Sequence, residues 1–520
     1  MRFFKTLSIV FLICGLVSVA SADLALLKQG VSDYKNKSFV NAAIKFYDLT
    51  KNNSLDEELK IKAEYYLGLS LYSLKLYQAS SYPIVKVIQS KSNKYKKKSL
   101  LKLIAISNKL GDQRMLDFAL SAIDVNDIQK SADDIYYFKL ASLSYDKGDM
   151  SGAINHLKTS IGRNPKNEAA LNLLALSYLK KNETENAINS YLKLLELYDG
   201  RESSHIKRSY TVLNTARAYF QAKKYAQAVE FYIKIYKNSE AYRESLPELG
   251  WTYFYLGQYA KAQGVLQSLH SPFYENFFEP ESLVLRAILL NYNCNSEAAE
   301  VVVNNYNSNY SNILKILTDW AALKANIIDV MAEVNYANEV LLNEKSKKES
   351  SIETIKNYGG KIPFKVTRTM LKDSRLKAIT DTFLIIKNES ESTKKLFGNI
   401  QNSLKPYLDS IYDDRINFYN NQIVVIFNKV VQGLEKKLSY YTQQMMFVNY
   451  EIIDEKKKQT RVRSNQADQF TEVSDRQEKN KKIKISSVSK DMKYWPFDGE
   501  FWKDEIGNTL YFGESLCVQE

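Results

Sequence analysis

The sequence predicts an all-α protein made of stacked pairs of short helices, followed by longer helices and an aromatic C-terminal tail. Three observations lead to this prediction. The 520 residues include only 18 Gly and 8 Pro, too few for the many turns of a β-sandwich or barrel. Apolar residues recur at helical spacing along most of the chain. One pattern of large and small residues also returns at intervals of 34 residues.

Residues 1–22 have the layout of a secretory signal peptide. Arg2 and Lys5 supply positive charge, and residues 7–19 are apolar but shorter than the roughly 20 residues of a membrane-spanning helix. Ala20 and Ala22 provide the small side chains of a cleavage site. We therefore expect cleavage after Ala22 and export to the periplasm, with an uncleaved membrane anchor as the alternative.

The chain carries a formal net charge of +13, which suits acidic partners or an anionic membrane surface. The positive residues are spread along the sequence and do not form the concentrated basic patch that is typical of nucleic-acid-binding proteins. Export also makes nucleic acid an unsuitable target. We expect no nucleic-acid partner.

Four consecutive units of paired helices begin near residues 134, 168, 209 and 243. Large residues form one stripe of the first helix, and small residues in both helices allow a close approach. The residues at these positions are Tyr137, Leu140, Ala141, Ala153 and Leu157; Leu171, Leu174, Ala175, Tyr178, Ala187 and Tyr191; Val212, Ala216, Tyr219, Ala228 and Tyr232; and Leu246, Leu249, Gly250, Tyr253, Ala262 and Leu266. One pair cannot bury its own apolar face, so neighbouring pairs must stack on it. Weaker copies extend the array to about seven units over residues 23–310.

This pattern resembles the tetratricopeptide repeat family. The resemblance implies a superhelical solenoid whose first helices line a concave groove. The groove residues that it implies are Phe138, Tyr145, Asn172, Arg217, Phe220, Trp251, Phe254 and Tyr255. Aromatic residues dominate the last two units, as expected of a groove that binds a peptide or helix. The alternative is that a neighbouring helix, an insertion or the C-terminal segment fills the groove.

Residues 311–462 are expected to form a long-helix hairpin or bundle. Apolar spacing from Ile313 to Leu341 predicts a helix longer than those of the repeats, and Gly359, Gly360 and Pro363 mark a break. The longest apolar stripe predicts a helix over 407–462, on the order of 80 Å long at about 1.5 Å per residue. This extension either protrudes from the solenoid or packs back along it.

The C-terminal part of the chain changes character twice. Residues 463–493 are polar and Lys-rich, which predicts a flexible basic linker. Residues 494–520 begin with a dense aromatic and acidic segment that includes Tyr494, Trp495, Phe497, Phe501 and Trp502. Because exposure of so many rings is unfavourable, we expect this segment to fold back on the chain or to dock on a partner.

No catalytic or metal-binding motif stands out. His156, His205 and His270 lie in different repeats without the spacing of metal ligands, and the sequence has no GxSxG, HExxH, P-loop or dinucleotide fingerprint. We expect neither enzymatic activity nor a cofactor or metal. After cleavage, Cys294 and Cys517 either form a disulfide or remain separate thiols.

The layout of signal peptide, repeat array, helical extension and aromatic tail is similar to periplasmic or outer-membrane-associated tetratricopeptide proteins. Such proteins occur with gliding-motility and envelope machinery in myxobacteria and predatory bacteria. The resemblance implies an adaptor that holds cell-envelope proteins together, with the long helix as a second contact. The alternative is binding of an anionic envelope polymer, such as peptidoglycan, or of a membrane surface through the basic C-terminal region. The sequence leaves the oligomeric state open.

Overall fold

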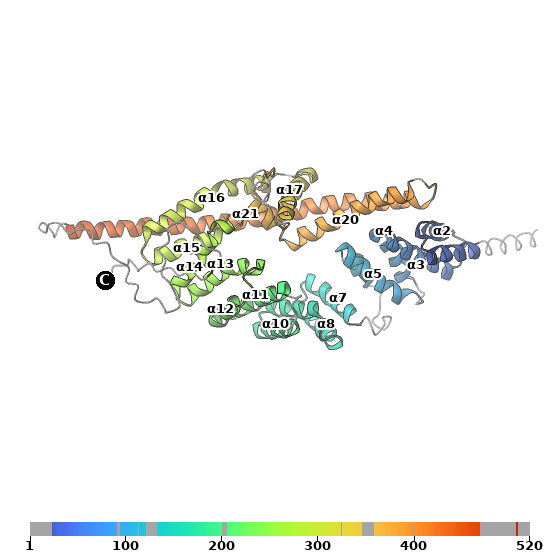
Figure 1. The fold of residues 1–520 in the computed structure, drawn as a ribbon, viewed down its shortest axis with the longest axis horizontal. Coiled ribbons are helices and arrows are strands. Elements are labelled where there is room, and N and C mark those ends of the chain that lie inside the picture. Colours follow the sequence, from blue (N-terminus) through green and yellow to red (C-terminus); the bar gives the residue numbers. More distant parts are fainter. Residues whose placement is uncertain are drawn as a thin grey trace, which may run out of the picture. The chain divides into compact units, whose positions relative to one another are not determined.

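The computed structural model describes residues 23–90, 94–112, 114–120, 133–199, 205–323, 325–345, 358–398, 400–467 and 506–507 (Figure 1). Every regular element in these ranges is a helix, which confirms the all-α prediction. None of the described helices is long and apolar enough to cross a membrane. The predicted signal peptide, the predicted linker beyond residue 467 and the rings of the aromatic tail lie outside the described residues.

The chain divides into two compact units. The first contains residues up to Asn182 together with 325–335 and 370–430, and the second contains 183–324, 336–369 and 431–520. Each unit therefore combines repeat helices with part of the 311–462 extension.

Paired antiparallel helices make up most of the first unit. Residues 23–35 form a helix that precedes α2 (Phe39–Lys51). The following helices are α3 (Glu57–Ser73), α4 (Tyr77–Gln89), α5 (Lys96–Leu110), α6 (Arg114–Leu120), α7 (Asp133–Asp146), α8 (Met150–Arg163) and α9 (Glu168–Lys180). Each helix from α2 to α6 packs against the next, as does each helix from α7 to α9, as a stacked array requires.

The second unit continues the same organisation. Its repeat helices are α10 (Thr184–Tyr198), α11 (His205–Gln221), α12 (Tyr225–Tyr232), α13 (Glu240–Tyr255), α14 (Tyr259–Leu269), α15 (Pro280–Tyr292) and α16 (Ser296–Ala322), with a short 3-10 helix at Pro272–Tyr274. Sequential helices pack against one another, and α13 also packs against α11 and α15, the first helices of the neighbouring pairs. The second unit is therefore also a stack of helical pairs.

Small residues make the close packing within each pair possible. The small residues of the repeat pattern are fully buried in both helices of the pairs: Ala141, Ala153, Ala175, Ala187, Ala216, Ala228 and Ala262. A Cβ atom added at Gly68 would lie 2.6 Å from Cγ1 of Ile84, and one added at Gly250 would lie 3.2 Å from Cδ2 of Leu266. The first helix thus approaches the second so closely that an additional methyl group at these positions would force the neighbouring side chain to move.

The turn inside each pair uses a left-handed backbone conformation. Gly148 and Gly257 adopt it with φ of 83° and 69°. Residues with side chains occupy the equivalent turns, with φ between 56° and 62°: Lys37, Lys75, Asn182, Lys223 and Cys294. The left-handed conformation costs a residue other than glycine roughly 1–2 kcal/mol. Packing of the two helices therefore imposes this turn whatever residue occupies it.

Residues 311–341 form parts of two helices, so the single long helix predicted from their apolar spacing is wrong. Helix α16 ends at Ala322, and Leu323 has an extended backbone with φ −72° and ψ 141°. The side chain of Asn326 then accepts hydrogen bonds from the backbone N–H groups of Ile328 and Asp329, at 2.9 and 3.0 Å. This N-cap starts a new helix, α17 (Ile327–Lys345), at a point where the apolar spacing continues unchanged.

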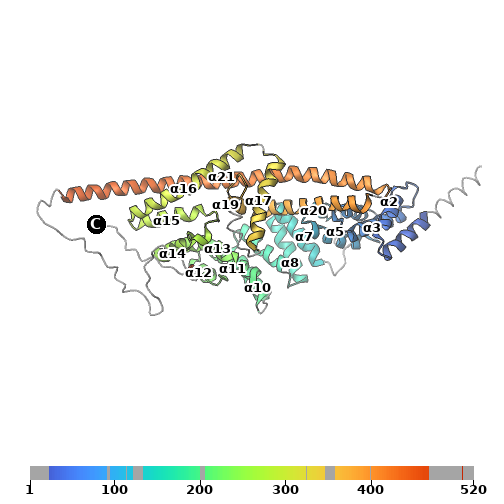
Figure 2. The ribbon, with the colours of Figure 1, turned by 45° about the horizontal axis from the view of Figure 1, so that its top comes forward.

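Three further helices follow α17: α19 (Phe364–Met370), α20 (Ser374–Phe397) and α21 (Leu404–Ala467). The last has 64 residues and includes the predicted helix over 407–462. Pro406 lies in its first turn, where the missing N–H group has no helical acceptor to lose. Figures 1 and 2 both show α21 as one uninterrupted helix, with α20 running antiparallel beside its first half.

In the first unit, α20 and the start of α21 pack on the repeat helices. The buried carboxyl group of Glu389 in α20 accepts hydrogen bonds from the backbone N–H of Gln78 in α4 and from the hydroxyl of Tyr412 in α21, both at 3.0 Å. The Thr382 hydroxyl donates to the carbonyl of Leu110, at the end of α5, at 2.7 Å. Of the two arrangements that the sequence allowed, this part of the extension adopts the one that packs back along the array.

In the second unit, the remaining part of α21 also packs on repeat helices. The Tyr441 hydroxyl donates to the carboxylate of Glu281 at the start of α15. Thr442 and Tyr306 of α16 share a hydrogen bond between their hydroxyl groups at 3.0 Å. Leu438, Met445, Val448 and Ile452 are buried on the same side of α21. This part of α21 therefore has one face that belongs to the core of the second unit.

Candidate functional site

A row of touching aromatic rings crosses three consecutive helical pairs of the second unit. We call it the aromatic ladder, and it consists of Phe220, Tyr225, Trp251, Phe254, Tyr255, Tyr259 and Tyr292. Neighbouring ring centroids are 4.9 to 6.1 Å apart. Offset and edge-to-face contacts at such distances are favourable, so the rings hold one another in position.

The repeat explains where most of these rings lie. Phe220 is close to the end of α11, and Tyr225 begins α12. The residues 34 positions later, Phe254 and Tyr259, lie close to the end of α13 and at the start of α14. Each pair thus contributes rings on both sides of its internal turn, and stacking of the pairs brings these rings into one row.

Four rings of the ladder were predicted from the sequence, Phe220, Trp251, Phe254 and Tyr255, and the three remaining rings were not. Two of those three, Tyr225 and Tyr259, occupy the same position of successive repeats, so the 34-residue pattern could have revealed them. Tyr292 ends the first helix of the last pair and extends the row through a 4.9 Å contact with Tyr259. The second helices were not expected to contribute to a groove lined by first helices.

Some rings of the ladder are exposed to solvent, and others are half-buried and held by hydrogen bonds to neighbouring helices. Tyr255 and Tyr292 are 53% and 60% exposed, whereas Trp251 and Phe254 are half-buried. The indole N–H of Trp251 donates to Glu281 at 2.9 Å, and Glu281 also accepts from Tyr441 of α21. A neighbouring helix therefore supports one edge of the ladder but leaves its outer rings accessible.

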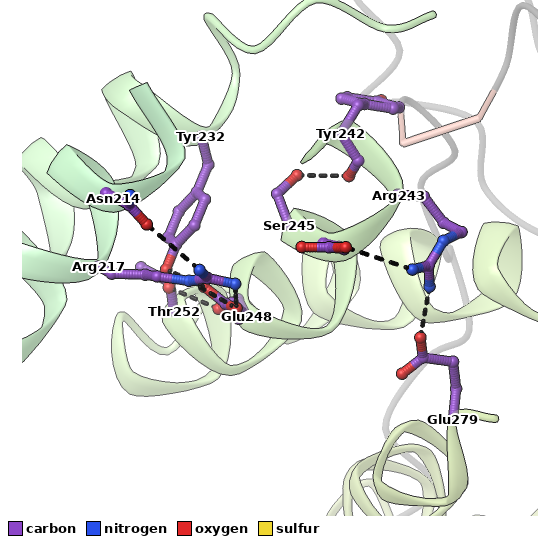
Figure 3. Close-up of polar contacts among 10 residues, drawn as sticks. Asn214, Arg217, Tyr232, Tyr242, Arg243, Ser245, Glu248, Thr252 and Glu279 are labelled. Carbon is purple, nitrogen blue, oxygen red and sulfur yellow. Dashed lines mark hydrogen bonds and ion pairs between the residues drawn. The ribbon is translucent and has the colours of Figure 1, made fainter. Parts of the chain in front are cut away.

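Arg217, the one cation among the predicted groove residues of this unit, is already paired (Figure 3). Its guanidinium forms a bidentate contact with Glu248 of α13, with the shortest distance 2.6 Å, and also reaches the side-chain oxygen of Asn214 at 3.3 Å. The Tyr232 hydroxyl donates to the same carboxylate at 3.0 Å. Burial, and then the charge of Glu248, raise the pKa of Tyr232. The network links two pairs and is electrically neutral, so Arg217 adds little net charge to the surface.

Three predicted groove residues belong to the first unit. Phe138 and Tyr145 lie on α7 and Asn172 on α9, and all three are half-buried. The ammonium group of Lys180 lies 3.8 Å from the ring centroid of Tyr145, a cation–π contact between α9 and α7. The structure places these residues on first helices of the array, as the repeat pattern predicts. It brings only the four aromatic residues of the second unit into mutual contact.

Two residues of the C-terminal segment are described, and they lie against the second unit. Ile506 is buried in the core formed by α11, α13 and α14. Its carbonyl accepts a hydrogen bond from the Tyr242 hydroxyl at 2.8 Å, and the N–H of Gly507 donates to the hydroxyl of Ser268 at 3.0 Å. This part of the segment folds back on the chain. The predicted docking rings Tyr494, Trp495, Phe497, Phe501 and Trp502 lie outside the described residues.

Cys294, in the turn between α15 and α16, is disulfide-bonded. Its partner lies outside the described residues, as does Cys517. The pairing of Cys294 with Cys517 stays a prediction. Ile506 and Gly507 mark the neighbourhood of α13 and α14 as the region to test for attachment of the tail.

Ser282 of α15 and His270, which follows the last residue of α14, form a hydrogen-bonded pair. The Ser282 hydroxyl lies 3.2 Å from Nε2 of His270, and burial followed by the charge of Arg286 lowers the pKa of this imidazole to about 3. Ser282 also donates its proton to the carbonyl of Glu279 at 2.6 Å, so it must accept from the N–H of His270. The imidazole therefore cannot remove the serine proton, and Ser282 is 1% exposed. The pair is a buried hydrogen bond.

No three His, Cys, Asp or Glu side chains of the described ranges are grouped closely enough to hold a metal ion. The basic end of α21 is partly neutralised within the second unit. Lys456 forms an ion pair with Glu300 of α16, and Lys458 forms one with Asp454 at 2.9 Å. Two of the three consecutive lysines thus have carboxylate partners in the protein itself.

These features define an α-helical repeat protein with a partly exposed aromatic surface. Residues 138–202 match the model of the tetratricopeptide repeat family, so this segment is similar to tetratricopeptide repeats. The matched segment includes the units that begin near 134 and 168, where the sequence analysis placed two of its four strongest repeats.

Several solved structures show limited similarity. The apo form of RapI has 12% identity and a TM-score of 0.33, with 77% of this chain and 98% of that chain covered. The complex of Naa15 and Naa10 bound to HypK has 11% identity and a TM-score of 0.35, covering 82% and 64%. The complex of the TPR2AB domain of yeast Sti1 with pHSP90 has 17% identity and a TM-score of 0.19, covering 46% and 99%. No curated protein sequence matches the chain.

Proposed function

We propose that this protein is a non-enzymatic scaffold that binds protein partners through the aromatic ladder of its second unit. The observation that carries the proposal is the ladder itself, seven rings from three helical pairs with Tyr255 and Tyr292 more than half exposed. Aromatic side chains dominate the energetics of many protein interfaces because they bury a large area and lose little conformational entropy.

The chemistry of the ladder favours a partner segment with apolar side chains. The charge of Arg217 is neutralised by Glu248, and the indole N–H of Trp251 already donates to Glu281, so both groups have partners within the protein. The exposed parts of Tyr255 and Tyr292 offer ring faces and hydroxyl groups. An amphipathic helix or an extended peptide could bury its apolar side chains on these rings while its polar side remains in water.

The cellular setting of the proposal comes from the sequence. Residues 1–22 have the charge, apolar run and small residues of a secretory signal, which supports a scaffold in the periplasm that connects proteins of the cell envelope. The alternative, an anionic polymer or membrane bound by the basic C-terminal region, draws on residues 455–493. Ion pairing of Lys456 and Lys458 within the protein makes the described part of this region less available for such binding.

Crosslinking in intact cells followed by isolation of the protein tests the proposal. We expect Tyr255→Ala to lose the crosslinked partner, because it removes the ring that contacts four other members of the ladder. Tyr236→Ala is the matched control, since Tyr236 is 56% exposed in the same unit and is not part of the ladder. Retention of every partner by Tyr255→Ala, with an unchanged circular dichroism spectrum, would refute the proposal.

The salt dependence of binding separates the two candidate functions. The affinity of a partner protein that binds to the aromatic ladder should change little between low and high ionic strength. Binding of an anionic polymer to lysines should weaken steeply over the same range. A steep decrease for every partner would favour the polymer or membrane alternative.

A further inference from the structure

The part of α21 in the second unit has a second apolar face opposite the one that packs on the repeats. The helical period of 3.6 residues places the buried Leu438, Met445, Val448 and Ile452 on one side. On the opposite side lie Tyr440, Phe447 and Tyr450, and Met446 and Ile453 lie between this side and Thr442; all five are large and between 45% and 71% exposed. A helix that only covered the array would need polar residues there.

The exposed area is large for an isolated patch. At about 150–250 Å² for each full aromatic side chain, and somewhat less for Met and Ile, the five exposed fractions add up to on the order of 600 Å². The largest apolar patches on monomeric proteins measure roughly 300–600 Å² and often take part in binding. This face of α21 therefore has the size of an interface.

The spacing of this face is that of a coiled-coil seam. The residues at alternating steps of four and three along it are Lys436, Tyr440, Gln443, Phe447, Tyr450, Asp454 and Lys457. Three of these seven positions are aromatic, and a stripe with this spacing can lie against a second helix with the same stripe. In contrast, the apolar face that packs on the repeats is already occupied through Tyr441 and Thr442. The chain thus carries a seam without a described partner helix.

We propose that this seam binds the same seam of a second copy of the chain, in an antiparallel arrangement. In an antiparallel pair centred on residue 445, Tyr440 of one copy lies opposite Tyr450 of the other, and Gln443 lies opposite Phe447. Lys436 then lies opposite Asp454, which also pairs with Lys458 of its own helix, and Lys457, the third charged position of the seam, lies opposite Gly433. Two-fold symmetry repeats every contact, as in most homodimers.

The border of the seam shows the same complementarity. Lys437 and Glu451 lie along one edge, and both are exposed. In the antiparallel pair, each Lys437 lies beside Glu451 of the other copy, which gives two attractive contacts. On the other edge Met446 meets its own counterpart at the two-fold axis. A parallel pair would instead place Lys436 against Lys436 and Asp454 against Asp454, which is unfavourable.

The area is consistent with reversible self-association. Without Ile453, two copies would together bury about 1,000 Å², in the range of weak and transient interfaces. We expect a dimer that dissociates in the micromolar range. The seam lies on α21 and shares no residue with the aromatic ladder, so each surface can be tested without changing the other.

Sedimentation equilibrium of the purified full chain at about 1 to 100 µM tests the proposal. We expect the mass to rise from monomer to dimer with concentration. Phe447→Ser combined with Tyr450→Ser should abolish the dimer, because it removes two of the three rings of the seam. Tyr236→Ser is the control for loss of an exposed ring of the same unit, and it should leave the dimer intact.

A charge exchange tests the antiparallel register even if the serine variant were to lose structure. Lys437→Glu should weaken the dimer about tenfold, since it turns two attractive contacts into repulsive ones. Lys437→Glu together with Glu451→Lys should restore the affinity to within about twofold of the original chain. This rescue is expected only when these two positions lie opposite each other.

Three outcomes would overturn the proposal. The original chain could remain a monomer over the whole concentration range. The dimer could persist in the Phe447→Ser and Tyr450→Ser variant, or the charge exchange could fail to rescue association. A monomer that co-sediments with vesicles of phosphatidylglycerol through Phe447 and Tyr450 would assign the face to a membrane surface instead.

Discussion

Glu389 makes the stability of the first unit depend on pH in a direction that the structure defines. Glu389 is 4% exposed, and its Oε2 accepts hydrogen bonds from the backbone N–H of Gln78 and the hydroxyl of Tyr412. Oε1 has no hydrogen-bond partner among the described residues. Burial, only partly offset by these hydrogen bonds, raises the pKa of Glu389 from 4.5 to about 8. The folded protein thus holds a proton that the unfolded chain releases.

The sign and size of the effect follow from proton linkage. Between pH 4.5 and about 8 the unfolded chain has lost the Glu389 proton while the folded chain keeps it, so the free energy of unfolding falls as pH rises. At about 1.4 kcal/mol per pKa unit, the total loss is on the order of 3 to 5 kcal/mol. Glu389→Gln cannot ionise, and its amide oxygen can still accept both hydrogen bonds. We therefore expect the free energy of unfolding of Glu389→Gln, relative to that of the original chain, to rise by this amount from pH 4 to pH 9.

Urea unfolding, followed by circular dichroism at several pH values, measures the difference. Glu391→Gln is the matched control, because Glu391 lies on the same helix and is exposed. The free energy of unfolding of this control should differ from that of the original chain by the same amount at every pH. A difference between Glu389→Gln and the original chain that changes by less than about 1 kcal/mol from pH 4 to pH 9 would refute the reasoning.

Three further predictions concern the repeat packing and the C-terminal segment. Gly68→Ala should lower the free energy of unfolding by about 1–3 kcal/mol in urea titrations, because the added methyl group would lie 2.6 Å from Cγ1 of Ile84. Gly250→Ala should lower it by less, because its methyl group would lie 3.2 Å from Cδ2 of Leu266. Equal losses of stability in the two variants would contradict this. Lys223→Gly should raise the melting temperature, since it relieves about 1 kcal/mol of strain at φ 59°, and a decrease would show that the lysine side chain contributes more than the strain costs. Gly507→Ala should expose the C-terminal segment to limited proteolysis, because the added Cβ would lie 2.1 Å from the hydroxyl oxygen of Tyr242; unchanged protection would contradict this.

The sequence predicted most of the repeat packing because the relevant information is local. Ala175 and Ala216 could be placed at helix–helix contacts from spacing alone, and both are fully buried. The break after Ala322 was missed because the apolar stripe runs through it, and the signal that ends one helix and starts the next is the capping side chain of Asn326. Apolar periodicity reports which face is buried, and it does not report where the backbone changes direction.

The candidate site was only partly predictable for a different reason. Phe220 and Trp251 were found because they occupy first-helix positions that face the groove in related repeats. The pairing of Arg217 with Glu248 depends on the rotation between successive helical pairs, which no local pattern specifies. The burial of Glu389 likewise depends on α20 packing against α4, a contact between residues 311 positions apart. Long-range packing, and not local propensity, decides which polar side chains are paired within the protein and which can still bind a partner.

Hydrogen–deuterium exchange of the full chain, with and without the partner captured by crosslinking, tests the central claim most directly. We expect the partner to slow exchange at the ends of α11, α13 and α15, where the rings of the aromatic ladder lie. Exchange in α7 and α8 of the first unit should stay unchanged and serves as the internal reference. Protection confined to residues 453–460 of α21, with none at Trp251 to Tyr255, would contradict binding at the ladder.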